Sequence, residues 1–254
     1  MQCPYCKSTE VRKNGKRRGK QNHICIKCDR QFIDVYNPPK GYSEELKQEC
    51  LKMYLNGMGF RGIERVKGVH HTTIIYWVKQ LGEKLPDVPK EDIVPEVGEL
   101  DELETFIGSK KTKFWLWTAV NHFTQGILAW VLGDHSAETF EPLWKIVEQW
   151  KSYFYVTDGW KVYPGFIPDG DQIVSKTYMT RVENENTRLR HYLARLHRKT
   201  LCYSKSEQML RHSIKLLLHY LKYQIVPTQI NSSLYSATPN FSTDAEITDG
   251  IFIH

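Results

Sequence analysis

Hydrophobic positions recur with a helical period in the part of the chain that follows its first forty residues. Apolar side chains spaced three or four apart predict three short helices, over residues 43–56, 60–66 and 71–79. Ser43 is a suitable N-cap for the first helix, and Gly57 and Gly68 are suitable ends for the first two. We expect one small core beneath the helices, formed by Ile63, Val66, Val69, Ile74 and Val78.

Over residues 96–223 the pattern changes, because β-branched and aromatic residues gather in short runs between helical stretches. We expect strands over 97–107, 113–121, 126–132, 153–157 and 172–175, and helices over 136–150, 180–196 and 206–223. Ser136 is a suitable N-cap. The helix over 180–196 should bury Val182, Leu189, Leu193 and Leu196. Three antiparallel strands followed by strand–helix alternation are typical of an α/β domain with a mixed sheet.

Three other stretches set the boundaries of the expected domains. Residues 86–95 contain three prolines and are expected to be a linker. Residues 224–254 contain no Lys or Arg and are rich in Ser, Thr, Asn and Asp, which is typical of a disordered tail. Residues 1–40 are rich in cysteine and in basic side chains. The chain therefore divides into modules over 1–40, 41–85 and 96–223, with the linker and the tail.

The positive charge of the chain is concentrated in its first forty residues. The formal net charge is +6, and residues 1–40 alone hold ten Lys and Arg against three Asp and Glu. A basic head on a nearly neutral body favours a polyanion as the partner, although a solvated basic arm has the same composition. No apolar run approaches the roughly 20 residues of a membrane helix, and no signal peptide opens the chain. We expect a cytoplasmic protein with no membrane partner.

Two Cys-x-x-Cys pairs, Cys3/Cys6 and Cys25/Cys28, predict a structural zinc site. Four thiolates suit tetrahedral Zn²⁺, and a forty-residue module has little core of its own, so the metal would supply folding energy. Cys50 and Cys202 stand alone and are expected to be small buried hydrophobes. The basic side chains between the pairs should form a rim that faces phosphates: Arg12, Lys13, Lys16, Arg17, Arg18 and Lys20.

The helical segment over 41–85 has the order of a helix-turn-helix, in which the second helix of the motif enters the major groove of DNA. A small helical bundle with structural polar positions has the same pattern. The neighbouring basic zinc module favours the DNA-reading interpretation. The side chains expected to face DNA are His70, His71, Thr72, Thr73 and Tyr76.

Acidic residues occur where a metal-dependent active site would need them. On the strand over 97–107, alternation puts Glu99 and Asp101 on one face and Glu102 and Glu104 on the other. Asp158 follows a short apolar strand and precedes a glycine, at the end of a strand where α/β sheets place their sites, although a turn or helix-cap role fits it too. Glu183 and Glu185 lie near the start of a basic helix, where an ion-pair role also fits. The pattern alone favours a metal-dependent, nuclease-like domain and does not choose among these acids.

Several longer motifs resemble the transposase family of insertion sequence 1. They are Glu99-x-Asp101-Glu102 with Phe106-Ile107-Gly108, Gly133-Asp134-x-Ser136, Thr157-Asp158-Gly159-Trp160-x-x-Tyr163, Ser175-Lys176, Val182-Glu183-x-x-Asn186-x-x-Leu189-Arg190, Ala194-Arg195-Leu196-x-Arg198-Lys199-Thr200 and Ser204-Lys205-Ser206. The resemblance covers roughly residues 1–223. Chains of this family usually end near the equivalent of Tyr223, so residues 224–254 look added, and we expect them to be dispensable.

The resemblance implies a ribonuclease-H-like catalytic domain behind the zinc ribbon and the helix-turn-helix. Its metal site would be Asp101, Asp158 and Glu183 holding Mg²⁺ or Mn²⁺, with Asn186 and Arg190 orienting the site or holding a phosphate. The implied activity is cleavage of double-stranded DNA at the terminal repeats of a mobile element and transfer of the freed strand into target DNA, by a homo-oligomer that brings two ends together. Expected contacts to the DNA backbone are Arg188, Arg195, Arg198, Lys199 and Lys205.

Two other functions stay open from the sequence. The first is a DNA-binding regulator or inactive transposase copy that uses only the zinc and helix-turn-helix modules. The second is a nuclease that cuts DNA without joining it. The three acids favour the transposase, because a regulator has no need of Asp101, Asp158 and Glu183 together.

Overall fold

A computed structural model describes residues 1–17, 19–33, 41–89 and 94–227 of the chain, in two compact units, Met1–Ser43 and Glu44–His254. Arg18, part of the expected linker and all but the first four residues of the expected tail lie outside the described residues. Among the described residues, no helix combines the length and the apolar character that a membrane crossing requires.

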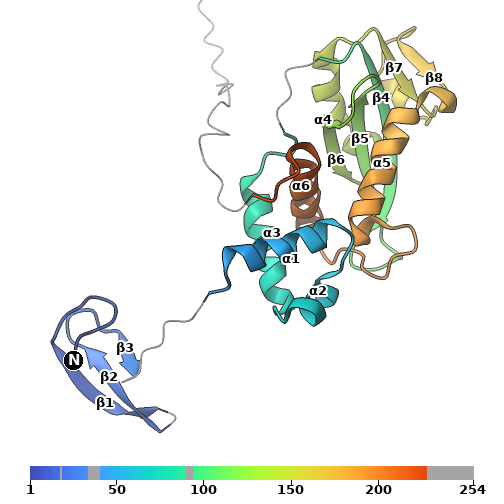
Figure 1. The fold of residues 1–254 in the computed structure, drawn as a ribbon. Helices are drawn as coiled ribbons and strands as arrows, with labels where there is room; N and C mark the ends of the chain where they lie inside the picture. The colour runs from blue at the N-terminus through green and yellow to red at the C-terminus, as the bar shows by residue number, and fades with distance from the viewer. Residues whose placement is uncertain (18, 34–40, 90–93, 228–254) are drawn as a thin grey trace, which may run out of the picture. The chain divides into compact units, whose positions relative to one another are not determined.

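The first unit is a small antiparallel sheet in the order β1-β2-β3 (Figure 1). Its strands are β1 (Val11–Arg17), β2 (Lys20–Cys25) and β3 (Gln31–Ile33). Its buried apolar cluster consists of Cys3, Cys25 and Phe32. A core of this size stabilises a fold poorly without a metal ion or another cross-link.

The second unit contains a five-stranded mixed sheet in the order β6-β5-β4-β7-β8. The strands are β4 (Val97–Phe106), β5 (Lys113–Asn121), β6 (Ile127–Gly133), β7 (Phe154–Thr157) and β8 (Gln172–Val174). The first three are antiparallel neighbours along the chain, whereas β7 and β8 run parallel to β4. The expected mixed α/β sheet is therefore confirmed, with β4 at its centre.

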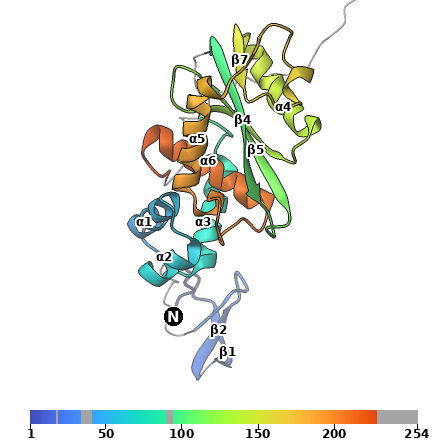
Figure 2. The same cartoon turned by 90° about the vertical axis from the view of Figure 1, so that its right-hand side faces the viewer.

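Helices cover both faces of this sheet, as the two views show (Figures 1 and 2). On one face lies α4 (Ala137–Val147), whose N-cap Ser136 accepts a hydrogen bond from the backbone N–H of Thr139. On the other lie α5 (Thr180–Tyr192) and α6 (Glu207–Tyr223). Leu100 of β4 belongs to the cluster under α4, and Leu103 belongs to the larger cluster under α5 and α6. Leu100 and Leu103, an even-numbered and an odd-numbered residue of β4, therefore face opposite sides of the sheet, as the alternation predicts.

The three N-terminal helices of the second unit share that larger core. They are α1 (Glu44–Leu55), α2 (Phe60–Lys67) and α3 (His71–Lys84). Leu55 of α1, Ile63 of α2 and Val78 of α3 belong to the same hydrophobic cluster as Leu217 of α6. At Gly82 a Cβ atom would lie 2.4 Å from the Cβ of His212, so α3 and α6 cross with their backbones in close approach. Glycine at this position permits the crossing.

Four details differ from the sequence-based expectations. Val66 is 60% exposed, so it is not part of the small core, whereas Ile63, Val69, Ile74 and Val78 are fully buried. Cys202 is exposed, although Cys50 is buried as expected. Helix α5 ends at Tyr192, because Leu193 is extended before a short 3₁₀ turn (η4, Ala194–Leu196). Val226, which belongs to the expected tail, is 6% exposed and packs into the large core, whereas Ile225 before it is exposed.

The remaining elements are short 3₁₀ turns. They are η1 (Glu148–Trp150), η2 (Tyr163–Gly165) and η3 (Lys176–Tyr178). Turn η2 follows β7 and puts Tyr163, which is fully buried, among the aromatic rings on the α4 face of the sheet. This loop therefore lies next to the strand ends that carry the acidic residues.

Candidate active site and metal centres

Asp101 lies in β4, and Asp158 directly follows β7, the parallel neighbour of β4 in the sheet. The last paired positions of the two strands are Glu99 and Val156, and Asp101 and Asp158 each lie two residues beyond them along the chain. Burial, followed by the charge of Glu102 and more weakly that of Asp158, raises the pKa of Asp101 to about 7. A buried carboxyl group with further carboxyl groups beside it is a site that attracts a cation.

Asn186 of α5 connects that helix to Asp101. Its side-chain Nδ2 donates to Asp101 Oδ2 over 2.8 Å. The hydroxyl of Thr118 on β5 donates to Asn186 Oδ1 over 3.1 Å, which fixes the amide with its nitrogen toward the carboxylate. Both Asn186 and Thr118 are buried. Three elements, β4, β5 and α5, therefore hold one oxygen of Asp101 in place.

Glu102 points to the other face of β4 and is held by two side chains. Tyr163 donates its hydroxyl to Glu102 Oε2 over 2.8 Å, and His135 Nε2 lies 3.1 Å from Glu102 Oε1. Burial raises the pKa of Glu102, and the charge of Asp158 acts in the same direction. The His135 ring is stacked between Trp115 and Trp160, with ring centroids 4.8 and 4.2 Å away. The sequence motifs contain Glu102, Tyr163 and Trp160, but spacing alone did not predict that they form this network.

Of the two acids left open on α5, one is engaged and the other is exposed. Glu185 is 2% exposed, forms an ion pair with Arg188 at 2.9 Å, and accepts a hydrogen bond from the N–H of Gly126 in the β5–β6 turn. Glu183 is exposed and lies one helical turn before Asn186, on the same side of α5. Of these two acids, Glu183 is therefore the exposed one, and it lies on the side of α5 that carries Asn186, the partner of Asp101.

A third acid, Glu99, holds the start of α5. It is fully buried, its Oε2 accepts a hydrogen bond from the backbone N–H of Val182 at 2.8 Å, and its Oε1 lies 2.5 Å from His122 Nδ1. A carboxylate that receives an unpaired N–H of the first helical turn acts as a cap supplied from another element. Glu99 thus positions the helix that carries Glu183 and Asn186.

The basic side chains of this region differ in their surroundings. Arg190 donates to the backbone oxygens of Leu196 and Glu104, and burial lowers the pKa of its guanidinium. Arg195 is 7% exposed, and its guanidinium lies 5.4 and 5.2 Å from the ring centroids of Tyr54 and Phe60. Both arginines therefore hold the fold together, and Arg195 has little surface to offer DNA.

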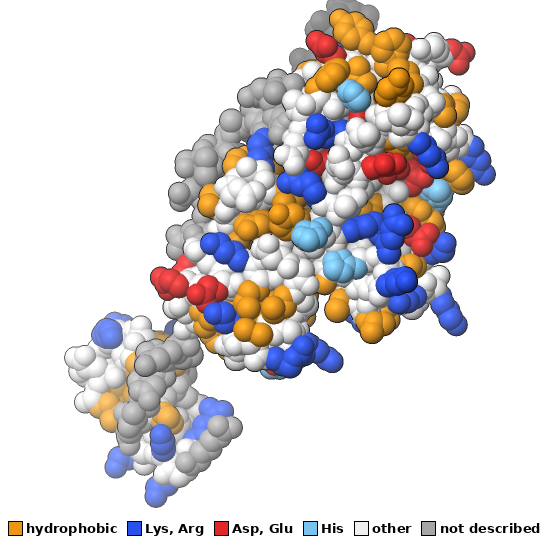
Figure 3. All heavy atoms as spheres, turned by 45° about the vertical axis from the view of Figure 1, so that its right-hand side comes forward, with side chains coloured by type: hydrophobic (Ala, Val, Ile, Leu, Met, Phe, Trp, Pro, Cys, Tyr) orange, Lys and Arg blue, Asp and Glu red, His pale blue; other side chains and the backbone are white. Residues whose placement is uncertain are grey.

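Other basic side chains remain exposed. They include Arg198, Lys199 and Lys205 after α5, while Arg188 is half-buried against Glu185. Basic, acidic and histidine side chains lie close together on the face of the larger unit drawn in Figure 3. Arg198, Lys199 and Lys205 are therefore accessible to a phosphate group.

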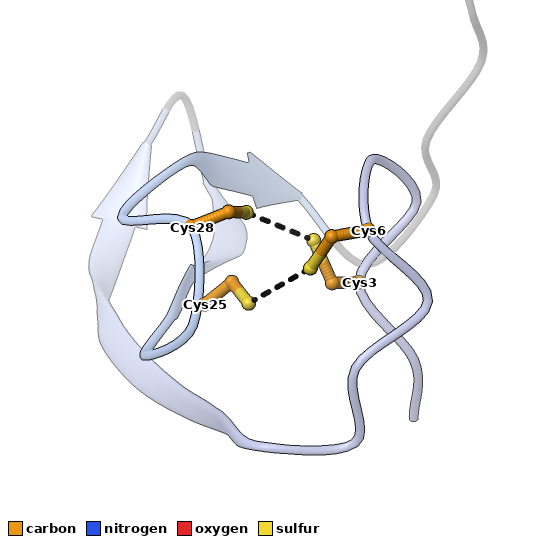
Figure 4. A group of neighbouring side chains, drawn as sticks. All are labelled: Cys3, Cys6, Cys25 and Cys28. Carbon is orange, nitrogen blue, oxygen red and sulfur yellow. Dashed lines mark hydrogen bonds between the residues drawn. The ribbon is translucent and has the colours of Figure 1, made fainter.

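The four cysteines of the first unit converge on one point (Figure 4). Cys3 and Cys28 have their sulfurs 3.6 Å apart, and Cys6 and Cys25 have theirs 3.5 Å apart. Thiolates bound to one tetrahedral zinc ion at about 2.3 Å lie about 3.8 Å from each other. The two Cys-x-x-Cys pairs form the same turn. The N–H of Lys7 donates to the backbone oxygen of Cys3, and the N–H of Asp29 donates to the backbone oxygen of Cys25. The cluster is therefore consistent with structural zinc.

The expected DNA-facing residues occupy two surfaces. Arg12, Lys13, Lys16, Arg17 and Lys20 are exposed on the β1–β2 hairpin of the first unit. On α3, Thr72 and Tyr76 are exposed and Thr73 is half-buried. His71 instead points to Glu64, with 2.8 Å between its Nδ1 and Glu64 Oε2.

The order of the strands, with helices on both faces, one acid within the central strand β4 and another directly after its parallel neighbour β7, defines a ribonuclease-H-like domain. The family model described as IS1 transposase matches residues 94–225, which is more than half of the chain. The chain belongs to the IS1 transposase family, whose catalytic domain is of the DDE type.

Individual relatives agree with this assignment. The chain is 34% identical to the insertion element IS1 protein InsB of Shigella flexneri over 48% of its own length and 92% of that protein. It is 35% identical to the iso-IS1n InsB of Shigella dysenteriae over 44% of this chain and 85% of that protein. For an IS1 InsB of Escherichia coli K12 the identity is 32%, over 52% and 77%. The matches thus cover most of each relative and about half of this chain.

Proposed function

We propose that the chain cleaves double-stranded DNA at the ends of its element and joins the freed strand to target DNA, using Asp101, Asp158 and Glu183 to hold two Mg²⁺ or Mn²⁺ ions. The observation that carries the proposal is the placement of Asp101 in β4 and of Asp158 directly after β7, the parallel neighbour of β4, with Asn186 of the Glu183 helix hydrogen-bonded to Asp101. Membership of a DDE transposase family supports a site of this kind, with three acidic residues.

The donor set fits hard divalent cations. Carboxylate oxygens are the ligands that Mg²⁺ and Mn²⁺ prefer. Burial and neighbouring charges raise the pKa of both Asp101 and Glu102, and a bound cation would stabilise the ionised forms of these carboxyl groups. Two divalent ions bound by such carboxylates activate the attacking oxygen and stabilise the leaving oxygen of a phosphodiester.

The residues around the acids have positioning roles in this proposal. Asn186 fixes one oxygen of Asp101, so the other is directed to the metal. Tyr163 and His135 hold Glu102 beside the site. Glu99 anchors the first turn of α5, from which Glu183 extends. Orientation of this kind is what separates a productive two-metal site from a loose acidic patch.

DNA would be bound by modules outside the catalytic sheet. In this proposal residues 1–40 are a zinc ribbon whose exposed hairpin contacts phosphates, residues 41–85 form the helix-turn-helix, and residues 96–223 form the catalytic domain. Thr72, Thr73 and Tyr76 remain candidates for base contacts on α3, and Arg198, Lys199 and Lys205 remain candidates for backbone contacts. Bringing two element ends together would require at least a dimer.

The test is Mg²⁺-dependent cleavage and strand transfer by the full chain on DNA that carries the element's own ends. Asp158→Asn should abolish both steps and leave DNA binding intact. Asp169→Asn is the matched control, because Asp169 is exposed in the loop after η2, and it should behave as the unchanged chain. Cleavage by Asp158→Asn at the unchanged rate would exclude the proposed site.

The same assay separates the other functions. Cleavage without joined products would indicate a nuclease that does not transfer strands. Binding of the element ends without cleavage by any of the three proteins would indicate a DNA-binding regulator or an inactive copy. In both cases metal analysis of the full chain should still find zinc, which Cys25→Ser should remove.

A further inference from the structure

A second group of metal-binding side chains lies between α2 and α3, outside the cysteine cluster and the catalytic acids. It consists of Glu64 near the end of α2, His70 before α3 and His71 at the first position of α3. One ligand atom from each of the three side chains lies within 4.8 Å of the other two. Glu64 Oε2 is 2.8 Å from His71 Nδ1, and Glu64 Oε1 is 3.7 Å from His70 Nε2.

These distances are close to those required around one ion. Nitrogen and oxygen ligands at about 2.0–2.1 Å from tetrahedral zinc lie about 3.3–3.4 Å from each other. The distance from His70 Nε2 to Glu64 Oε1, 3.7 Å, is a few tenths of an ångström wider than this, and the distance from His71 Nδ1 to Glu64 Oε2, 2.8 Å, is about half an ångström narrower. The side chains are half-buried or exposed, so rotations of their outer torsion angles bring both pairs to the required separation.

Local hydrogen bonds prepare the two imidazoles. His70 Nδ1 lies 2.7 Å from the hydroxyl of Thr72 and, as the N-cap of α3, accepts a hydrogen bond from the backbone N–H of Thr72 over 3.4 Å. When Nε2 binds a metal ion, the imidazole proton lies on Nδ1, which can then donate to the Thr72 hydroxyl. A histidine ligand is usually oriented through its second nitrogen in this way. A glutamate side chain is ionised at neutral pH, so Glu64 can bind a cation without first losing a proton.

We propose that Glu64, His70 and His71 bind a transition-metal ion of the zinc class, with a fourth position open to solvent. Two imidazole nitrogens and a carboxylate oxygen are a common ligand set for Zn²⁺ and for neighbouring ions such as Ni²⁺ and Cu²⁺. The metal replaces the proton between His71 Nδ1 and Glu64, and this proton is released to solvent. The ion joins the end of α2 to the first turn of α3. This inference does not depend on the proposed DNA cleavage.

The experiment is calorimetric titration of Zn²⁺ into the full chain whose cysteine cluster is already loaded with one zinc ion. We expect one further equivalent to bind. Glu64→Gln and His71→Ala should each weaken that binding at least tenfold. His197→Ala is the matched control, because it removes an exposed histidine from another part of the second unit, and it should bind zinc as the unchanged chain does.

A second measurement uses the unchanged chain and so does not depend on how the variants fold. Zinc at the proposed site should protect His70 and His71 from acylation by diethyl pyrocarbonate, detected by peptide mass spectrometry, while His197 continues to react. The proposal is overturned if the loaded chain binds no further zinc, if both variants bind it as tightly as the unchanged chain, or if the two histidines react equally with and without zinc.

Discussion

Asn186 donates its side-chain amide to Asp101 over 2.8 Å, which ties helix α5 to the proposed metal-binding carboxylate on the central strand of the sheet. The amide is itself oriented by Thr118, which donates to its oxygen from β5. Because Glu183 lies one turn before Asn186, the position of the last acid of the proposed triad depends on a contact made by its neighbour. The geometry of the site is thus determined by the packing of α5 as well as by the acids.

Asn186→Ala should reduce Mg²⁺-dependent strand cleavage by about 10–100-fold, the usual effect of removing a group that orients a metal ligand. The loss should be partly recovered at higher Mg²⁺, because the carboxylates remain and only their orientation is relaxed. The measurement is the cleavage rate as a function of Mg²⁺ concentration. Asn184→Ala, an exposed asparagine of the same helix, is the control. Equal rates for the two variants would contradict a positioning role for Asn186.

Cleavage should fall as the pH is lowered through about 7. The pKa of Asp101 is raised to about 7, mainly by burial and then by the charge of Glu102. A metal ion binds the ionised carboxylate, so below this pH it competes with a proton for Asp101. The apparent Mg²⁺ affinity, measured at pH 6 and pH 8, should be lower at pH 6. An affinity independent of pH in this range would contradict the prediction.

The same pKa shift predicts how the stability of the metal-free chain depends on pH. A carboxyl group with a raised pKa in the folded state stabilises the fold fully below its unfolded pKa of 3.8, and this contribution is lost as the pH rises through about 7. Asp101→Asn removes the buried charge, so it should be more stable than the parent at pH 8, by about 4 kcal/mol at most. Chemical denaturation of both proteins at pH 5 and pH 8, with a metal chelator present, provides the comparison.

Much of the fold followed from local sequence patterns. The strand β5 has the predicted bounds, and the caps Ser136 and Ser206 begin α4 and α6 as their residue types suggest. Such signals act within one or two helical turns, and a single sequence contains them fully. The two Cys-x-x-Cys pairs were recognisable for the same reason, since their spacing reflects the turn of each knuckle.

Contacts between distant segments could not be predicted in this way. Whether Arg195 faces DNA or packs on Tyr54 depends on residues more than a hundred positions apart. The same is true of Glu102, whose partners Tyr163 and His135 come from two different loops. The choice between Glu183 and Glu185 depends on the turn at Gly126. Hydrophobic periodicity predicts which face of a helix or strand is buried, but it does not predict which side chains of other elements contact that face.

The close crossing of α3 and α6 predicts an unusual response to substitution at Gly82. A methyl group there would lie 2.4 Å from the Cβ of His212 and 2.7 Å from its Cα. Gly82→Ala should therefore lower the free energy of unfolding by about 1–3 kcal/mol, the usual cost of overpacking, although alanine favours helix by about 1 kcal/mol. Gly62→Ala is the control in α2, because its nearest neighbour is the flexible end of Met58 at 3.1 Å. This control should be neutral or stabilising in the same denaturation experiment.

The last residues of the core predict where the chain tolerates truncation. Val226 is 6% exposed and belongs to the large hydrophobic cluster, so a chain ending at Tyr223 loses its burial, worth about 1.5–3 kcal/mol for a valine. A chain ending at Pro227 keeps that contact and should have the stability and cleavage rate of the full chain, since we expect residues 228–254 to be dispensable. Val226→Ala in the full chain should reproduce part of the loss seen on truncation at Tyr223. If the chain ending at Pro227 is as unstable as the shorter one, residues 228–254 contribute to folding and the expectation is wrong.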